Sequence, residues 1–173
     1  MSALTALALV LAVVGGFFTY LFLAFPGLLI WAFFIGMACF FHAGGDQNAL
    51  RNTIVGNALG CVLAWITATV ILAVPLAATL TLPVWAGLAV GVAIIFIVLA
   101  ANIKAFAVIP ATVYGFASSF AFLLQTPDKL TLAKLQSASL DNALIVVLIS
   151  LIIGAVLGFV SAKVAPMLTA KAA

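Results

Sequence analysis

The main concentration of polar residues in this chain is a short segment that follows an apolar stretch. The segment runs from His42 to Asn52 and reads His-Ala-Gly-Gly-Asp-Gln-Asn-Ala-Leu-Arg-Asn. At 3.6 residues per helical turn, Asn48, Asn52 and, less closely, Arg51 share one face. Such a face could supply hydrogen-bond donors and acceptors to a small solute, as a vestibule or filter. The alternative is an ordinary cytoplasmic turn in which Asp46 caps a helix and Arg51 anchors it.

Asn57 is the strongest single candidate for a solute pathway or an interhelical bond. It lies about two turns into the apolar part of the helix that starts near Asp46, where an unpaired amide costs free energy. We therefore expect its side chain to face the protein interior and to hydrogen-bond another helix or water. A second polar site, Asn102 with Lys104, is either part of the same pathway or a turn with an anchoring lysine. Pro110, soon after, either kinks its helix or lies in the first turn.

No constellation of residues in the sequence indicates catalysis or metal binding. His42 is the single histidine, and neither an HxxxH nor an ExxH pattern accompanies it. It is either a proton relay or, more simply, an interfacial residue at a helix end. The acids Asp46, Asp128 and Asp141 are all expected in turns. Ion-coupled carriers generally keep an ionisable group within the membrane, so the expected lack of a buried acid argues against that class. We expect no enzyme activity, no metal and no cofactor.

The composition places these residues in a membrane. Of 173 residues, 68% are hydrophobic and 5% are charged, whereas soluble domains have about 25% charged residues. Leu4–Phe25 and Ala143–Val160 contain no Asp, Glu, Lys or Arg, and each is long enough to cross a hydrocarbon core of about 30 Å. The sequence predicts an all-α, polytopic transmembrane helical bundle that forms one integral membrane domain over residues 1–173. The net charge of +3 is too sparse to indicate nucleic-acid binding.

About six membrane helices are expected, separated by proline, glycine and polar residues. The second is short, which leaves open whether it crosses the membrane or re-enters; Gly44-Gly45 should end it, and Asp46 should cap the third. Thr126-Pro127-Asp128 looks like the start of a short helix on the membrane surface. The expected spans are Ala3–Phe25, Leu28–Phe41, Asp46–Val74, Val84–Ala101, Ala105–Leu124 and Asn142–Lys163.

The distribution of basic residues predicts the orientation of the six spans. Cytoplasmic loops of membrane proteins carry an excess of Lys and Arg. With six spans, one side receives Arg51, Lys104, Lys163 and Lys171, and the other receives only Lys129 and Lys134. Both termini are therefore expected in the cytoplasm.

Small residues spaced four apart predict close helix packing. Three GxxxG motifs start at Gly56, Gly87 and Gly154, and each serves either packing within the monomer or a homo-oligomer interface. A weak internal repeat also relates helices two and three to helices four and five. Its matched pairs are Trp31 with Trp85, Asn48 with Asn102, Gly60 with Gly115, and Trp65 with Phe120. Both a duplicated hairpin and chance similarity explain these matches.

A run of glycines and aromatic residues between Leu29 and Trp65 resembles a known family. It comprises Trp31, Gly36, the turn at His42, the Asn-Ala-Leu-Arg-Asn run and Gly56-Asn57-x-x-Gly60. This pattern resembles the DUF1097 family of small bacterial inner-membrane proteins, which have no assigned function. It covers about a fifth of the chain. The resemblance implies a bacterial inner (cytoplasmic) membrane location and brings no substrate or catalytic residue.

Two functional hypotheses follow from these features. The first is a passive channel or facilitator for a small uncharged solute, whose pathway uses the polar residues named above. The second is a non-transporting accessory or structural subunit of a membrane complex. A continuous polar cavity that reaches Asn57 from the segment between His42 and Arg51 would favour the first hypothesis, and a fully packed bundle the second. The expected pathway residues are His42, Asp46, Asn48, Arg51, Asn52, Asn57 and Asn102.

Overall fold

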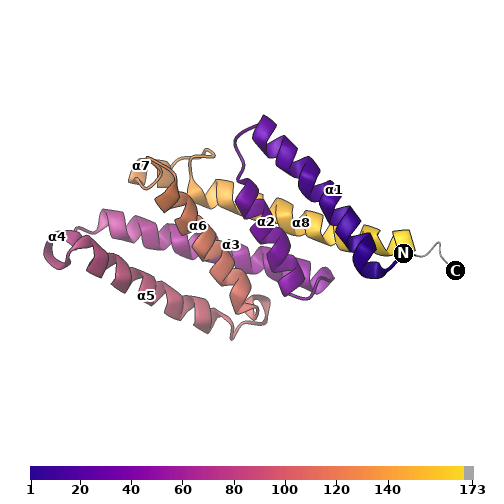
Figure 1. The fold of residues 1–173 in the computed structure, drawn as a ribbon. Coiled ribbons are helices and arrows are strands. Elements are labelled where there is room, and N and C mark those ends of the chain that lie inside the picture. The colour runs from indigo at the N-terminus through magenta and orange to yellow at the C-terminus, as the bar shows by residue number, and fades with distance from the viewer. Residues whose placement is uncertain (170–173) are drawn as a thin grey trace.

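The protein is a bundle of α-helices, described in a computed structural model over residues 1–169 (Figure 1). No β-strand occurs in these residues, which confirms the predicted all-α class. One 3-10 turn, η1, spans Lys104–Phe106. The α-helices are α1 (Ala3–Ala24), α2 (Ile30–His42), α3 (Gln47–Ala73), α4 (Ala77–Leu80), α5 (Leu82–Ala100), α6 (Ile109–Gln125), α7 (Leu132–Leu135) and α8 (Ala143–Thr169).

The break between α2 and α3 has the predicted cause. Gly44 and Gly45 have backbone φ angles of 119° and 70°, a region that residues with a Cβ rarely adopt. Asp46 then caps α3, because its carboxylate Oδ1 accepts a hydrogen bond from the Ala49 amide at 2.7 Å. With 13 residues, α2 is shorter than α1 and α3, as expected.

Within residues 1–169, four helices have the length and hydropathy to cross a membrane by themselves. These are α1, α3, α5 and α8. The two shorter apolar helices, α2 and α6, have 13 and 17 residues, so at 1.5 Å per residue they extend about 20 and 26 Å. Pro110 lies in the first turn of α6, where its missing amide costs no helical hydrogen bond, and it does not kink the helix.

Glycines bring α3 and α6 into close contact. A Cβ at Gly60 would lie 2.0 Å from the Thr112 carbonyl oxygen, and a Cβ at Gly115 would lie 2.2 Å from the Asn57 carbonyl oxygen. Gly60 and Gly115 are one of the matched pairs in the sequence, and each packs against the residue three positions before the other, Thr112 and Asn57, an equivalence that fits a duplicated hairpin.

A Cβ at Gly56 would lie 2.6 Å from the Ala111 Cβ, and a Cβ at Gly60 would lie 2.7 Å from the Phe116 amide nitrogen. Because these contacts advance together along both helices, α3 and α6 run parallel.

The second close pair is α2 and α8. A Cβ at Gly36 would lie 2.1 Å from the Leu151 carbonyl oxygen, and one at Gly154 would lie 1.9 Å from the Phe33 carbonyl oxygen. Two of the three GxxxG motifs, those at Gly56 and Gly154, therefore pack helices within the monomer. This is one of the two roles expected for them.

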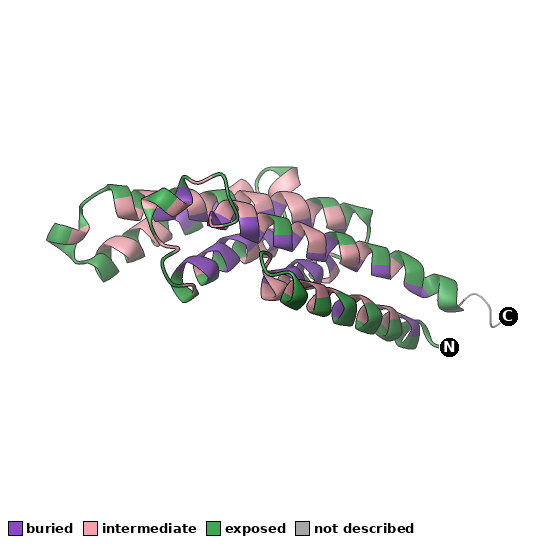
Figure 2. Ribbon diagram, turned by 90° about the horizontal axis from the view of Figure 1, so that it is seen from above, coloured by how far each residue is buried: buried purple, intermediate pink, exposed green. Residues whose placement is uncertain are grey.

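The helices α1 and α5 lie at the periphery of the bundle, and most of their residues are exposed (Figure 2). The third GxxxG motif is on α5. A Cβ at Gly87 or Gly91 would meet nothing within 4 Å, so this motif faces outward. In a bilayer that surface contacts lipid or another protein.

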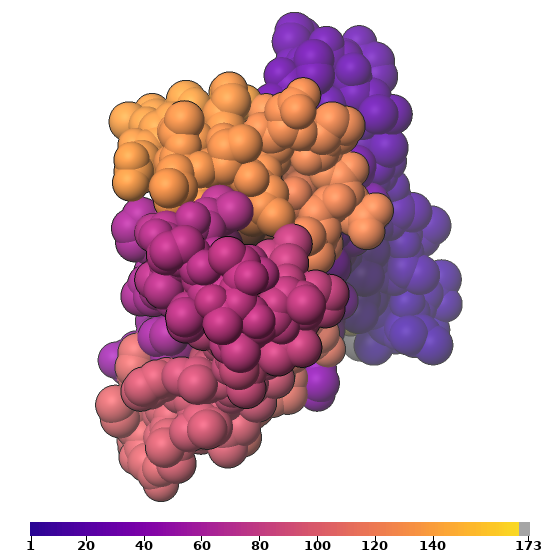
Figure 3. Space-filling model, turned by 90° about the vertical axis from the view of Figure 1, so that its left-hand side faces the viewer, coloured from indigo at the N-terminus to yellow at the C-terminus, as the bar shows by residue number. Residues whose placement is uncertain are grey.

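The connection between α6 and α8 differs from the prediction. No helix starts at Thr126-Pro127-Asp128, because Asp128 has a left-handed backbone with φ of 60°. The one-turn helix α7 starts later, where the Thr131 hydroxyl accepts a hydrogen bond from the Lys134 amide. Figure 3 shows this connection, in orange, directly above the magenta end of α3.

Side chains from α3 and from the start of α8 hold the connection in place. The Trp65 indole Nε1 and the Asn142 Nδ2 both donate to the Leu135 carbonyl oxygen at 2.7 Å. Lys129 and Lys134 both pair with the Asp141 carboxylate. Hydrogen bonds from these two lysines lower the pKa of Asp141 to about 2, so the carboxylate stays charged at physiological pH.

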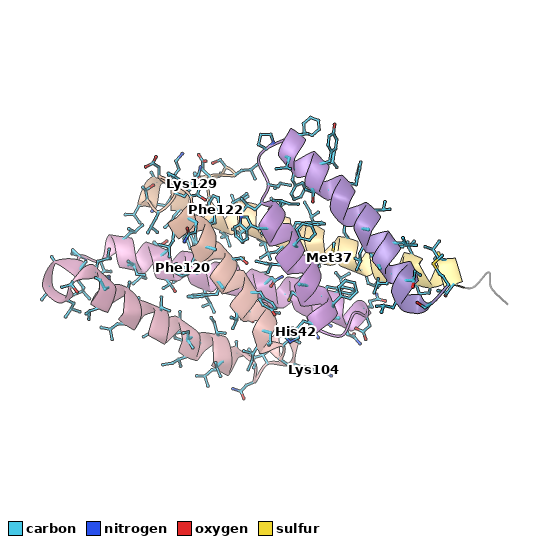
Figure 4. The ribbon with its side chains drawn as sticks, in the orientation of Figure 1. Met37, His42, Lys104, Phe120, Phe122 and Lys129 are labelled. Carbon is cyan, nitrogen blue, oxygen red and sulfur yellow. The ribbon has the colours of Figure 1, made fainter. Side chains whose placement is uncertain are left out.

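The cationic residues of the described chain divide between the two ends of the bundle. In Figure 4, His42 and Lys104 lie toward one end and Lys129 toward the other. The N-terminus and the end of α8 lie toward the His42 end (Figure 1). Arg51 and Lys163, near the start of α3 and the end of α8, belong to that end, whereas Lys171 falls outside the described residues. We call these two ends the His42 end and the Lys129 end.

Candidate functional site

A polar pocket of about 700 Å³ lies between the start of α3 and the η1 turn. Asn48, Arg51 and Asn52 line it from α3, one helical turn apart as their spacing predicted. Lys104 lines it from the opposite element, and Ile103, Ala105 and Ala107 complete the lining. The tertiary structure thus brings together the two polar segments of the sequence. The second segment contributes Lys104 to the pocket, and Asn102 does not line it.

Three other predicted residues lie near the His42 end without lining this pocket. The His42 ring nitrogen Nδ1 is 2.9 Å from the Tyr114 hydroxyl oxygen on α6, which ties the end of α2 to α6. Asp46 serves as the cap of α3. Asn102 is exposed, and its Nδ2 donates to the Leu99 carbonyl oxygen at 2.9 Å in the turn after α5. Their observed contacts are those of residues at helix ends.

Asn57 faces the protein interior, as predicted. Its side chain is 0% exposed, and neither Oδ1 nor Nδ2 has a hydrogen-bond partner among residues 1–169. The expected bond to another helix is therefore not made within the described chain. A buried polar group without a partner costs roughly 1–3 kcal/mol, so this amide lowers the stability of the bundle.

Asn57 belongs to a larger group of buried polar atoms on α3 and α6. Three hydroxyl oxygens share its condition, being buried and without a partner in the described chain: those of Thr53, Thr112 and Ser118. We call Thr53, Asn57, Thr112 and Ser118 the polar seam. Buried polar groups in proteins are nearly always hydrogen-bonded, so four such residues on two adjoining helices are unusual.

The polar seam extends into the interior of the bundle, away from the His42 end. Asn57 is ten residues after Gln47, the first residue of α3, and at 1.5 Å per residue it lies about 15 Å from that end. Ser118 is nine residues into α6, which starts at the same end, so its depth is similar. The pocket ends at Asn52 on α3, and Asn57 does not line it. Close contacts of Gly60 and Gly115 pack the helices beyond it. The continuous polar cavity that would favour the channel hypothesis is therefore not present in the described arrangement.

Sequence inspection identified Asn57 but missed the hydroxyls of the polar seam. Thr53 precedes Asn57 by four residues, about one helical turn. The spacing alone therefore predicts that both side chains lie on the same face of α3. Thr112 and Ser118 gave no such signal, because the sequence does not reveal which faces of α6 are buried. Hydroxyls in helices also commonly bond their own backbone, as Ser119 does with the Gly115 carbonyl oxygen.

Comparison with known proteins identifies a family but no characterised relative. The model of the family described as "Protein of unknown function (DUF1097)" matches residues 8–166. This match extends the resemblance between Leu29 and Trp65 to nearly the whole chain. No curated protein and no solved structure matches the chain.

Proposed function

The chain belongs to the DUF1097 family, and we propose that it is a non-enzymatic, passive facilitator for a small uncharged solute. The proposed pathway follows the polar seam between α3 and α6. The pocket lined by Asn48, Arg51 and Asn52 is its vestibule at the His42 end. The proposed pathway does not include three of the residues expected from the sequence. His42, Asp46 and Asn102 have structural roles at helix ends near the vestibule.

The polar seam is the observation that carries this proposal. Four polar side chains lie on α3 and α6 at increasing depth, with no protein partner in the described chain. Each could exchange a hydrogen bond with a passing solute without breaking one to the protein. None of the four carries a charge. An ion would lose its hydration there without a compensating charge, whereas a neutral solute needs only hydrogen bonds.

Transport along this seam requires α3 and α6 to separate beyond Asn52. At the crossing the glycines pack against backbone atoms of the facing helix. Within the described residues, these two helices are joined there by the weak hydrogen bond of the Cys61 thiol to the Gly115 carbonyl oxygen. Separation therefore exposes polar atoms that gain partners when a solute or water enters. The described arrangement corresponds to the closed state of the proposed facilitator.

The proposal is tested by swelling of proteoliposomes that contain the purified protein. Vesicles are challenged in a stopped-flow instrument with gradients of water, urea and glycerol, and with potassium chloride as a charged control. We expect faster equilibration of at least one neutral solute than in protein-free vesicles, and no change for the salt. Equal rates with and without protein for all the neutral solutes would refute the proposal.

We propose a multi-pass location in the bacterial inner membrane with the His42 end in the cytoplasm. Arg51, Lys104 and Lys163 lie at that end and Lys129 and Lys134 at the other, and the larger number of basic residues at the His42 end favours this orientation. A phosphatase that is active only in the periplasm should be silent when fused after Ala173, and active when inserted after Ser137. The opposite pattern would show that the orientation is inverted.

The exposed face of α5 favours a second candidate, an accessory subunit or homo-oligomer that does not transport. Gly87 and Gly91 leave an open, small-residue surface, which suits close approach of another helix in lipid. If copies of the chain associate there, Gly91→Leu should shift the detergent-solubilised protein toward the monomer mass in light scattering. Gly16→Leu, on the open face of α1, is the matched control and should leave the mass unchanged.

A further inference from the structure

The vestibule pocket contains two cationic side chains that no acid neutralises. Arg51 and Lys104 both line it from opposite elements, and neither forms an ion pair within residues 1–169, where both ion pairs involve Asp141. No acidic side chain lines the pocket. Asp46, the nearest acid along α3, directs its Oδ1 to the Ala49 amide. The pocket therefore has a positive electrostatic potential, which attracts anions and gives no such attraction to a neutral solute.

The other groups in the pocket complement a phosphate rather than a simple halide. Asn48 and Asn52 add side-chain amides that donate hydrogen bonds, and they lie on the face of α3 that carries Arg51. A guanidinium binds two oxygens of one phosphate at once, and an ammonium adds a point charge. The pocket is at the start of α3, where the partial positive charge of the helix end favours an anion.

One wall of the pocket is apolar and faces outward. Ile103 is 58% exposed and lines the pocket together with Ala105 and Ala107. A free phosphate ion has no apolar atoms that could pack against this wall. The glycerol and upper acyl carbons of a phospholipid would cover it. Basic pockets between membrane helices on the cytoplasmic side are known to hold anionic headgroups.

From these observations we propose that the vestibule pocket binds the phosphate of an anionic phospholipid headgroup. Arg51 and Lys104 contact the phosphate oxygens, Asn48 and Asn52 donate to the remaining oxygens or to the headgroup, and the chains leave past Ile103. The headgroup occupies the cationic part of the vestibule, beside the start of the polar seam. This inference requires only that the pocket faces a leaflet, and it holds whether or not the chain transports a solute.

Native mass spectrometry of the delipidated protein tests the inference by counting bound lipids. The probes are phosphatidylglycerol, inorganic phosphate, and phosphatidylcholine as the control with no net charge, whose choline cation Arg51 and Lys104 would repel. We expect one tightly bound phosphatidylglycerol, at least tenfold weaker phosphatidylcholine binding, and no competition from millimolar phosphate. Arg51→Gln or Lys104→Gln should weaken phosphatidylglycerol binding about fivefold each, and together about 25-fold, at roughly 1 kcal/mol per cation.

Lys163→Gln is the matched control, because Lys163 is a cation of the same end that does not line the pocket and lies 5.5 Å from the Phe159 ring centroid. It should leave phosphatidylglycerol binding unchanged. Arg51 and Lys104 are exposed, so their replacement removes no core packing, and a monodisperse elution profile verifies folding. Undiminished lipid binding by the double variant would overturn the inference. Equal loss in Lys163→Gln, or full competition by inorganic phosphate, would overturn the assignment to a lipid in this pocket.

Discussion

Gly60→Ala is expected to unfold or strongly destabilise the protein, although it adds a single methyl group. The new Cβ would lie 2.0 Å from the Thr112 carbonyl oxygen and 2.7 Å from the Phe116 amide nitrogen. Both are backbone atoms, so a side-chain rotation cannot relieve the clash, and α3 and α6 must move apart. Overpacking of a core usually costs about 1–3 kcal/mol, and we expect this variant to reach or exceed the upper value.

The measurement is the thermal midpoint of the purified protein in detergent, compared with that of Gly16→Ala. Gly16 also lies inside a long helix, but a Cβ there meets nothing within 4 Å. Alanine is a better helix former than glycine by about 1 kcal/mol, so Gly16→Ala should be neutral or slightly stabilising. If Gly60→Ala is as stable as Gly16→Ala, the parallel contact between α3 and α6 is wrong.

Asn57→Leu is expected to reduce solute flux about tenfold or more while the protein stays as stable as the wild type, or becomes more stable. Leucine keeps the branched arrangement of heavy atoms of asparagine and removes its polar atoms. Because neither amide atom of Asn57 has a partner in the described chain, the substitution breaks no bond of the folded protein. The barrier for a solute rises by the hydrogen bonds that it no longer makes, at roughly 1–1.5 kcal/mol each.

Thr112→Val tests the same expectation from the opposite helix. Valine has the shape of threonine, and the Thr112 hydroxyl is likewise buried and unpartnered, so folding is preserved even if leucine at position 57 is too bulky. Asn102→Leu is the control, because Asn102 is exposed and outside both the pocket and the polar seam. Unchanged flux in both seam variants, at unchanged stability, would remove the support for a pathway between α3 and α6.

The amino-acid sequence by itself determined the membrane character, the number of apolar helices (four long and two shorter in the structure) and the main break between them. These properties depend on composition and on local backbone preference. A chain with 5% charged residues cannot form a soluble surface, and consecutive glycines at 44 and 45 cannot continue a helix. The cap by Asp46 is likewise local, since its partner amide at Ala49 is three residues away.

The local signal for a helix start was wrong in the connection between α6 and α8. Thr126-Pro127-Asp128 has the composition of a helix start, yet the short helix begins after Thr131. The tertiary contacts decided this outcome, because Trp65 and Asn142 both bond the Leu135 carbonyl oxygen and Asp141 pairs with two lysines. Trp65 comes from α3, 70 residues before Leu135, so no local window of the sequence contains this partner, whereas Asn142, Asp141 and the two lysines lie within the connection itself.

The sequence predicted only part of the candidate site, because the rest depends on contacts between segments that are distant in the chain. Periodicity placed Asn48, Arg51 and Asn52 on one face of α3, but only the fold brings Lys104 across from them to form a basic pocket. The three GxxxG motifs look alike in sequence, and the structure buries two of them and leaves the one on α5 open. Helix periodicity specifies which residues share a face. Which face meets which neighbour depends on the packing of the whole bundle, and that packing also left the Asn57 amide buried without a protein partner.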